Sequence, residues 1–148
     1  MFQGATQLSL DSKGRITVPS GHRDALQVQS EGRLVMTAHP HRCLLLYPRP
    51  VWEPIRAQIM GFSSLDLHTG MLQRLLVGFA RDIEMDAAGR LLVTPEQRRF
   101  AGLDKDVMLI GQGSHFEVWS LEAWDAQLEK IMTLGDRLLP PGMEKLSL

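Results

Sequence analysis

Apolar and polar residues alternate in a short segment near the N-terminus, and the same pattern returns in the second half of the chain. Residues 8–19 read L-S-L-D-S-K-G-R-I-T-V-P, and residues 83–94 read I-E-M-D-A-A-G-R-L-L-V-T. Alternation with a period of two is typical of half-buried strands, and a glycine between two such segments indicates a tight turn. The chain therefore contains two related strand–turn–strand segments.

Each turn holds an aspartate, a glycine and an arginine at the same spacing. Glycine adopts the positive φ that a tight turn needs, and an aspartate can accept hydrogen bonds from turn N–H groups. The arginine then leaves the turn four residues after the aspartate. The residues are Asp11, Gly14 and Arg15 in the first turn and Asp86, Gly89 and Arg90 in the second.

The pattern beyond the turns predicts further strands and helices in each copy. In the first copy, strands are expected at Leu8–Asp11, Arg15–Val18, Leu34–Thr37 and Leu44–Tyr47. A short helix follows the second strand of each copy, over residues 19–26 and 94–101. Each copy ends in an amphipathic helix, with apolar stripes formed by Trp52, Ile55 and Ile59 and by Leu121, Trp124, Leu128 and Ile131.

The segment between the two copies has helical periodicity. Leu72, Leu75, Leu76 and Phe79 recur at i, i+3, i+4 and i+7, which predicts a bridging helix with Gly70 and Gly78 near its limits. We therefore expect a first unit over 5–60, a bridging helix or linker over 61–80, a second unit over 81–131 and a flexible tail over 132–148. A unit of ~50 residues buries too little surface to be stable alone, so the two copies should pack on each other.

Composition limits the function classes. Charged residues are 22% and apolar residues 44%, as in ordinary globular proteins, and no apolar run approaches a membrane span. A single cysteine, Cys43, excludes an internal disulfide and fits a reducing cytoplasm. The formal net charge of −1 means that nucleic-acid binding would depend on a local cationic patch.

Two arrangements of reactive side chains are candidates for an active site or a metal site. A pseudo-twofold axis could bring Asp11 and Asp86 together as an acid/base dyad, although turn capping balanced by the following arginine is the simpler interpretation. His39, His41 and Cys43 are spaced by two, as metal ligands on a strand are, but Pro40 favours a polar loop. We expect no catalytic residue, metal or cofactor.

The first turn and the helix after it carry a group of cations, namely Lys13, Arg15, His22 and Arg23. Such a group on a rigid turn suits phosphate contact, and a solvated turn with Arg15 paired to Asp11 is an equal alternative. The second copy has Ala87-Ala88 where the first has Ser12-Lys13. That turn has lost a cation, so Arg90 is assigned to the turn and to packing.

Several motifs resemble the MraZ family. They are the two Asp-x-x-Gly-Arg segments in order, the opening Met1-Phe2-x-Gly4, the segment Leu44-Leu45-Leu46-Tyr47-Pro48 and the segment Gln73-Arg74-Leu75-Leu76-Val77-Gly78. The resemblance covers roughly residues 1–131. It implies an α+β, β-rich fold in which two tandem AbrB-like swapped-hairpin units with flanking helices pack about a pseudo-twofold axis.

The resemblance also implies a function. It is that of a bacterial transcription regulator at the cytoplasmic nucleoid, assembled as a head-to-tail homo-oligomeric ring. Its partner would be double-stranded DNA, at direct repeats upstream of the division and cell-wall gene cluster including its own gene. DNA contact is expected from Lys13, Arg15 and Arg23, and Arg23 matches a DNA-contacting position of AbrB relatives. No membrane and no small-molecule substrate are expected.

Two other functions remain open at this point. One is an antitoxin-like AbrB module that binds a toxin partner, although such modules usually carry one AbrB unit and a long disordered arm. The other is an oligomeric scaffold that does not bind DNA and whose turn cations are solvated. An enzyme built on the two aspartates is more remote than either.

Overall fold

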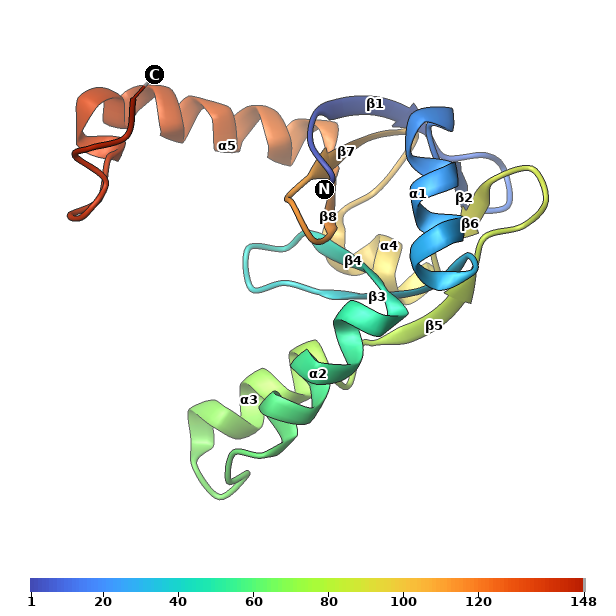
Figure 1. The fold of residues 1–148 in the computed structure, drawn as a ribbon, viewed down its shortest axis with the longest axis horizontal. Helices are drawn as coiled ribbons and strands as arrows, with labels where there is room; N and C mark the ends of the chain where they lie inside the picture. The colour runs from blue at the N-terminus through green and yellow to red at the C-terminus, as the bar shows by residue number, and fades with distance from the viewer. Residues whose placement is uncertain (148) are drawn as a thin grey trace.

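Residues 1–147, the part of the chain that our computed structural model describes, form eight strands and five α-helices (Figure 1). The strands are β1 (Ala5–Ser9), β2 (Arg15–Thr17), β3 (Arg33–Ala38), β4 (Leu44–Pro48), β5 (Arg81–Glu84), β6 (Arg90–Leu92), β7 (Asp106–Gly111) and β8 (Phe116–Ser120). The helices are α1 (Ser20–Ser30), α2 (Arg49–Met60), α3 (Leu67–Leu76), α4 (Pro95–Ala101) and α5 (Leu121–Leu134), and a 3₁₀ turn, η1 (Gly135–Leu138), follows α5. The expected α+β class is confirmed.

The strands form a six-stranded sheet of order β1-β7-β8-β4-β3-β5 and a separate two-stranded ribbon, β2-β6. All of these pairs are antiparallel. The first strand of each repeat therefore pairs with the third strand of the other repeat, β1 with β7 and β5 with β3. Within the described residues no ladder joins β1 to β2, so these two strands are not a local hairpin.

The order of the strands has internal twofold symmetry. If each strand is replaced by its counterpart in the other repeat, the order becomes β5-β3-β4-β8-β7-β1. This is the original order read from its other end. Leu45 lies opposite Glu117 at the centre of the β4–β8 ladder, and Ile16 lies opposite Leu91 at the centre of the ribbon. In the sequence, each of these pairs joins equivalent positions of the two repeats. A pseudo-twofold axis thus passes through both ladders.

The main core lies between one face of the sheet and the ribbon with its flanking helices. Ile16 and Leu91 point inward from the ribbon and are fully buried with Leu26 of α1 and Leu34 and Leu46 of the sheet. The opposite face of the sheet has two smaller clusters. Val35, Leu45, Tyr47 and Trp52 pack under α2 and α3, while Cys43, Met108, Ile110 and Trp119 pack under α5.

Helices α2 and α3 lie side by side and form one arm, and α5 forms a second arm (Figure 1). Gln73 of α3 connects the two helices of the first arm. Its amide donates to the carbonyls of Ile59 in α2 and Phe62 in the following loop, at 3.2 and 3.0 Å. Figure 1 shows the turns at β1–β2 and β5–β6 at one edge of the molecule, and both arms extending away from that edge. The turns and the ends of the arms thus lie on different sides of the molecule (Figure 1).

Several boundaries differ from the prediction. The bridging helix begins at Leu67, because Asp66 caps it by accepting the Thr69 N–H at 2.9 Å, and it ends at Leu76, so Phe79 lies outside it. The first strand covers Ala5–Ser9, because Ser9 pairs with Asp106, the first residue of β7. Helix α1 continues past Leu26 to Ser30. These errors are at element ends, where local pattern carries the least information.

Among residues 1–147, none of the helices combines the length and the apolar composition that crossing a bilayer requires.

Candidate nucleic-acid interface

The β2–β6 ribbon presents a short polar face to solvent. Residues directly opposite each other in an antiparallel pair point to the same side, and here Arg15 lies opposite Leu92 and Thr17 opposite Arg90. The intervening Ile16 and Leu91 point into the core. The outer face therefore carries two arginines at diagonal corners, with Thr17 and Leu92 at the other two.

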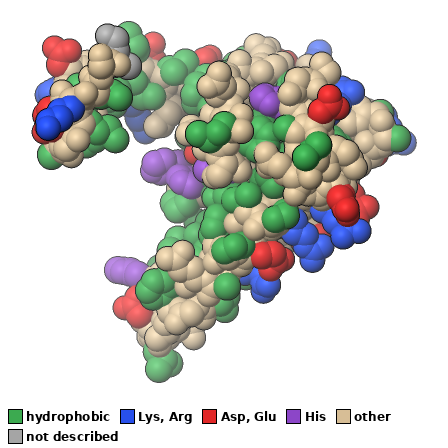
Figure 2. All heavy atoms as spheres, viewed as in Figure 1, with side chains coloured by type: hydrophobic (Ala, Val, Ile, Leu, Met, Phe, Trp, Pro, Cys, Tyr) green, Lys and Arg blue, Asp and Glu red, His purple; other side chains and the backbone are tan. Residues whose placement is uncertain are grey.

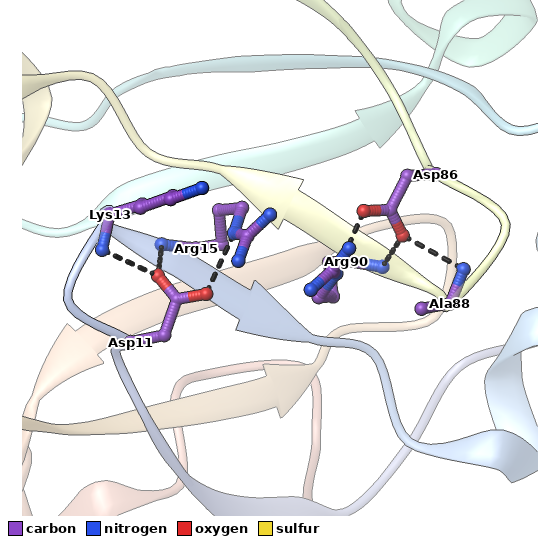
Figure 3. A network of polar contacts seen from close by, with 6 residues as sticks. All are labelled: Asp11, Lys13, Arg15, Asp86, Ala88 and Arg90. Atoms are coloured by element: carbon purple, nitrogen blue, oxygen red, sulfur yellow. Dashed lines mark hydrogen bonds and ion pairs between the residues drawn. The ribbon is translucent and has the colours of Figure 1, made fainter.

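The first turn is organised by the carboxylate of Asp11 (Figure 3). Its Oδ1 accepts the backbone N–H groups of Lys13 and Arg15 at 2.9 and 2.8 Å, and its Oδ2 accepts Arg15 Nε at 2.7 Å. Gly14 closes the turn by donating its N–H to the Asp11 carbonyl at 3.0 Å, with φ of +80°. Four hydrogen bonds thus fix the direction in which Arg15 leaves the turn.

The second turn repeats this geometry. Asp86 accepts the N–H groups of Ala88 and Arg90 at 3.0 and 2.8 Å and Arg90 Nε at 2.8 Å. Gly89 has φ of +78°. The positive φ expected at both glycines is confirmed. Because the two arginines make the same contacts, turn geometry does not distinguish Arg15 from Arg90.

The aspartates are held in their ionised form. In each turn, the N–H group of the following arginine is the main cause that lowers the pKa of the carboxyl below its usual 3.8, and the arginine side chain adds to it. An acid/base dyad that shares a proton requires one raised pKa. Figure 3 also shows Asp11 and Asp86 at opposite ends of the ribbon, each facing its own arginine. The dyad hypothesis is therefore wrong.

Each turn is covered by an arginine of the other repeat. A Cβ atom built on Gly89 would lie 2.4 Å from Arg23 Nε, and one built on Gly14 would lie 2.8 Å from Arg98 Cζ. Arg23 Nε donates to the carbonyl of Val18 at 2.7 Å. The positive φ favours glycine at both positions, and a Cβ there would also displace the arginine side chain that packs on the backbone.

The cationic group expected from the sequence is rearranged. Arg23 lies on the second turn, at the far end of the ribbon from Lys13 and Arg15, so the expectation of one compact cationic group on the first turn and the helix after it is wrong. His22 packs against the rings of Phe2 and Phe116 instead. The residue that joins Lys13 and Arg15 is Arg98, which comes from the other repeat.

Arg98 matches Arg23 in the sequence, since the two occupy equivalent positions of the two repeats, but the prediction gave Arg98 no part in DNA contact. Pairing across the repeats exchanges the positions of these two arginines. The reorganised group at the first turn is Lys13, Arg15 and Arg98. The group at the second turn is Arg90 and Arg23, with Ala88 in the place of the lysine.

The cations of the first turn keep donors available. Arg15 uses its Nε for Asp11, and its two terminal nitrogens donate no hydrogen bond within the described part of the chain. Lys13 is exposed and forms no ion pair with residues 1–147. Arg98 Nε, by contrast, is buried and has no hydrogen-bond partner among the same residues, so the available donors are those of Lys13 and Arg15. Free N–H donors on a rigid turn are what contact with phosphate or a base edge requires.

Three other arginines on the surface, Arg33, Arg49 and Arg56, are paired with acidic neighbours. Figure 2 shows a mixed cluster of basic and acidic side chains beside α2 and β5. Its ion pairs are Arg33 with Glu84 at 3.9 Å, Arg49 with Glu53 at 3.6 Å and Arg56 with Glu53 at 2.6 Å. This cluster has little excess positive charge. Of these two surfaces, the ribbon is therefore the better candidate for binding a polyanion.

The candidate metal ligands His39, His41 and Cys43 lie between β3 and β4. Within residues 1–147 no group of three or more histidine, cysteine or acidic side chains is arranged to hold a metal ion. His39 and His41 stack edge to face with ring centres 4.7 Å apart in the loop after β3. Burial raises the pKa of the Cys43 thiol to about 12, so no thiolate is present at neutral pH. The preferred interpretation of this segment as a polar loop is confirmed for residues 39–42.

The sequence is similar to those of known proteins along its whole length. The sequence model described as MraZ protein, antitoxin-like, matches twice, over residues 1–75 and 76–136. The chain is 63% identical to the transcriptional regulator MraZ of Methylobacillus flagellatus, and 53% identical to that of Dechloromonas aromatica, in both cases over the full length of both chains. The counterpart in Azoarcus sp. is 54% identical over 97% of each chain. This chain belongs to the MraZ family.

Proposed function

We propose that this chain is a transcription regulator that binds double-stranded DNA through the outer face of its β2–β6 ribbon. The observation that carries the proposal is the group at the first turn, where Lys13 and Arg15 have free donors on a rigid turn and Arg98 packs beside them. The names of the relatives, all transcriptional regulators, support the same class of function.

The dimensions of the ribbon suit the major groove. Strands of a sheet lie ~4.8 Å apart, and the major groove, ~12 Å wide, admits a two-stranded ribbon with its side chains. Arg15 and Arg90 then face the base edges at the floor of the groove, while Lys13 lies at the rim of the ribbon, near the phosphates. Arg23, which the sequence assigned to DNA contact, would act from the second turn, beside Gly89.

A single subunit offers few cations, and the affinity of DNA binding scales with the number of phosphates neutralised. We therefore propose that subunits assemble head to tail through the arms, whose exposed apolar residues include Phe62, Leu65 and Met132. A head-to-tail assembly presents ribbons in one orientation, which calls for direct repeats about one helical turn apart. The sites proposed are the repeats upstream of the division and cell-wall genes, including the gene of this protein, in the nucleoid.

A gel shift with the DNA directly upstream of this gene tests the proposal. Arg15→Ala should abolish the shift, because it removes the free guanidinium donors at the first turn. The matched control is Arg56→Ala, which removes an exposed arginine that is already paired with Glu53. Loss of binding only in Arg15→Ala, with melting temperature and oligomeric mass unchanged, supports the ribbon; equal binding by both variants contradicts it.

The salt dependence of the same shift separates phosphate contact from other modes. Each neutralised phosphate adds about 0.9 to the slope of log affinity against log salt. Lys13→Ala should lower that slope by about one per subunit bound. An antitoxin-like role, which the description of the family model suggests, would appear as a stable complex with a protein partner and no salt-dependent DNA shift.

A further inference from the structure

An exposed leucine lies on the polar face of the ribbon. Leu92 is 48% exposed, between Leu91 and Val93, which are both fully buried. It lies directly opposite Arg15, so the two side chains share the outer face. A solvent-facing strand position usually carries a polar or charged residue.

The counterpart of Leu92 in the first repeat is polar. Thr17 occupies the equivalent place in β2 and lies opposite Arg90. The same scaffold therefore presents an arginine–leucine pair at one end of the ribbon and an arginine–threonine pair at the other. Lys13 accompanies the arginine–leucine end, whereas Ala88 stands in its place at the other end.

We propose that Leu92 determines sequence specificity by packing against the C5-methyl group of a thymine in the major groove. This inference rests on the proposed DNA binding of the ribbon. The thymine methyl is the one apolar group that unmodified base pairs present in the major groove, and apolar side chains contact it. Thr17, with a smaller methyl and a hydroxyl, offers less apolar surface at the other end and can also bond a polar base edge.

The spacing of the pair fits neighbouring base pairs. Opposite residues of an antiparallel pair have Cβ atoms ~5 Å apart, and successive base pairs rise ~3.4 Å. Leu92 and Arg15 can thus reach two adjacent base pairs at once. Because Arg15 has two free terminal nitrogens, it can bind the O6 and N7 atoms of a guanine beside that thymine.

The difference between Leu92 and Thr17 gives each subunit a direction on DNA. A fully symmetric ribbon would bind a site equally well in either orientation. With the arginine–leucine end favouring thymine beside guanine, one orientation is preferred at every site. Subunits that share this preference require direct repeats, in which every copy of the site has the same orientation.

Deoxyuridine provides the test, because it pairs like thymidine and lacks only the C5-methyl group. The probe is the shortest duplex from the upstream DNA that the full-length protein shifts, synthesised with thymine and again with uracil at every thymine position. The wild-type protein should bind the uracil duplex at least about fourfold more weakly, the factor that one buried methyl-sized group gives. Leu92→Ala should bind both duplexes equally, and Leu92→Met should keep the preference for thymine.

The outcomes distinguish the inference from the function on which it rests. If the wild-type protein shifts no upstream duplex, the proposed function fails. If it binds both duplexes equally, or if Leu92→Ala keeps the preference for thymine, the proposal for Leu92 is overturned while DNA binding stands. A changed oligomeric mass for Leu92→Ala would show that the leucine packs against a neighbouring subunit, which also overturns the proposal.

Discussion

At the scale of single residues, each turn is held by three features that depend on one another. The aspartate orders the backbone, the glycine supplies the positive φ, and an arginine from the other repeat covers the glycine. Val18 N–H donates to the Gly89 carbonyl and Val93 N–H to the Gly14 carbonyl, at 2.8 and 2.9 Å. Each turn is therefore also a contact between the two repeats.

Replacing either turn glycine should cost stability. Gly14→Val or Gly89→Val places a branched side chain at a positive φ and displaces the arginine above it, so we expect a loss of about 1–3 kcal/mol. Urea denaturation measures the free energy of unfolding. The matched control is Gly21→Ala in α1, where no atom lies within 4 Å of the added Cβ. It should be neutral or stabilise by about 0.5–1 kcal/mol.

The turn aspartates should make stability depend on pH at the acid end. Their folded pKa values are lower than 3.8, so the ionised form is favoured in the folded state. This contribution is complete well above pH 3.8 and is lost as pH falls through the lowered folded values. Urea denaturation in this acid range should show a shallower loss of stability for Asp11→Asn than for the wild type. The same acid dependence in both proteins would contradict the account.

At the scale of elements, Gln97 connects α4 to the sheet. It completes a capping box with Thr94, and its buried amide also donates to the carbonyls of Met36 and Phe79 at 3.0 and 3.3 Å. Helix α4 is thereby fixed over β3 of the first repeat. The proline at the start of the helix could be read from the sequence, but the partners of the amide are distant in the chain.

Gln97→Leu should destabilise the protein by about 1–3 kcal/mol, since it leaves buried carbonyls without their donor and removes half of the capping box. Gln29→Leu on α1 is the control, because Gln29 is exposed. Thermal or urea denaturation compares the two variants. A Gln97→Leu protein as stable as the control would show that the amide bonds contribute no net stability.

The sequence predicts local features of this fold better than its distant contacts. The alternation around residues 8–19 identified the turn, and Thr94 with Pro95 identified the start of α4, because both depend on neighbouring residues. Alternation determines which side chains of a strand are buried, but it is the same whichever repeat supplies the partner strand. The positions of Arg23 and Arg98 follow from that partner, so the predicted cationic group was wrong in composition.

At the scale of the whole molecule, the fold is symmetric and its surface is not. The pseudo-twofold axis passes through the ribbon at Ile16 and Leu91. The first turn has Lys13 where the second has Ala88, and only the first arm contains an additional helix, α3. A symmetric core with two different ends is suited to head-to-tail assembly, in which each subunit offers unlike surfaces to its two neighbours.

Assembly should control DNA affinity. Charged substitutions on the first arm, Phe62→Asp with Leu65→Asp, should reduce the oligomeric mass and weaken specific binding by ~10²–10⁴, the gain that linked sites provide. Light scattering and gel shift measure the two effects. Circular dichroism must be unchanged, as both residues are exposed. Tight binding by a folded monomer would show that a single ribbon is sufficient.

The spacing of the DNA sites tests the proposed head-to-tail arrangement by changing the DNA instead of the protein. Inserting about half a helical turn, ~5 base pairs, between repeats rotates one site away from its ribbon and should abolish cooperative binding. Inserting ~10 base pairs should restore much of it. Equal binding to all three spacings would contradict a rigid head-to-tail arrangement.

The most direct test of the central claim, that the ribbon contacts DNA, uses a DNA-cleaving probe attached to the protein. The probe cuts the DNA that lies next to the attachment site. The chain has one cysteine, Cys43, which is fully buried, so an iron chelate reacts selectively with a thiol introduced at an exposed position. We would attach it at Ser12→Cys on the first turn and, as the control, at Val28→Cys on α1, which is 86% exposed. The account predicts cuts at the same place in every upstream repeat from position 12 and none from position 28. Cuts from position 28 with none from position 12 would show that another surface binds DNA.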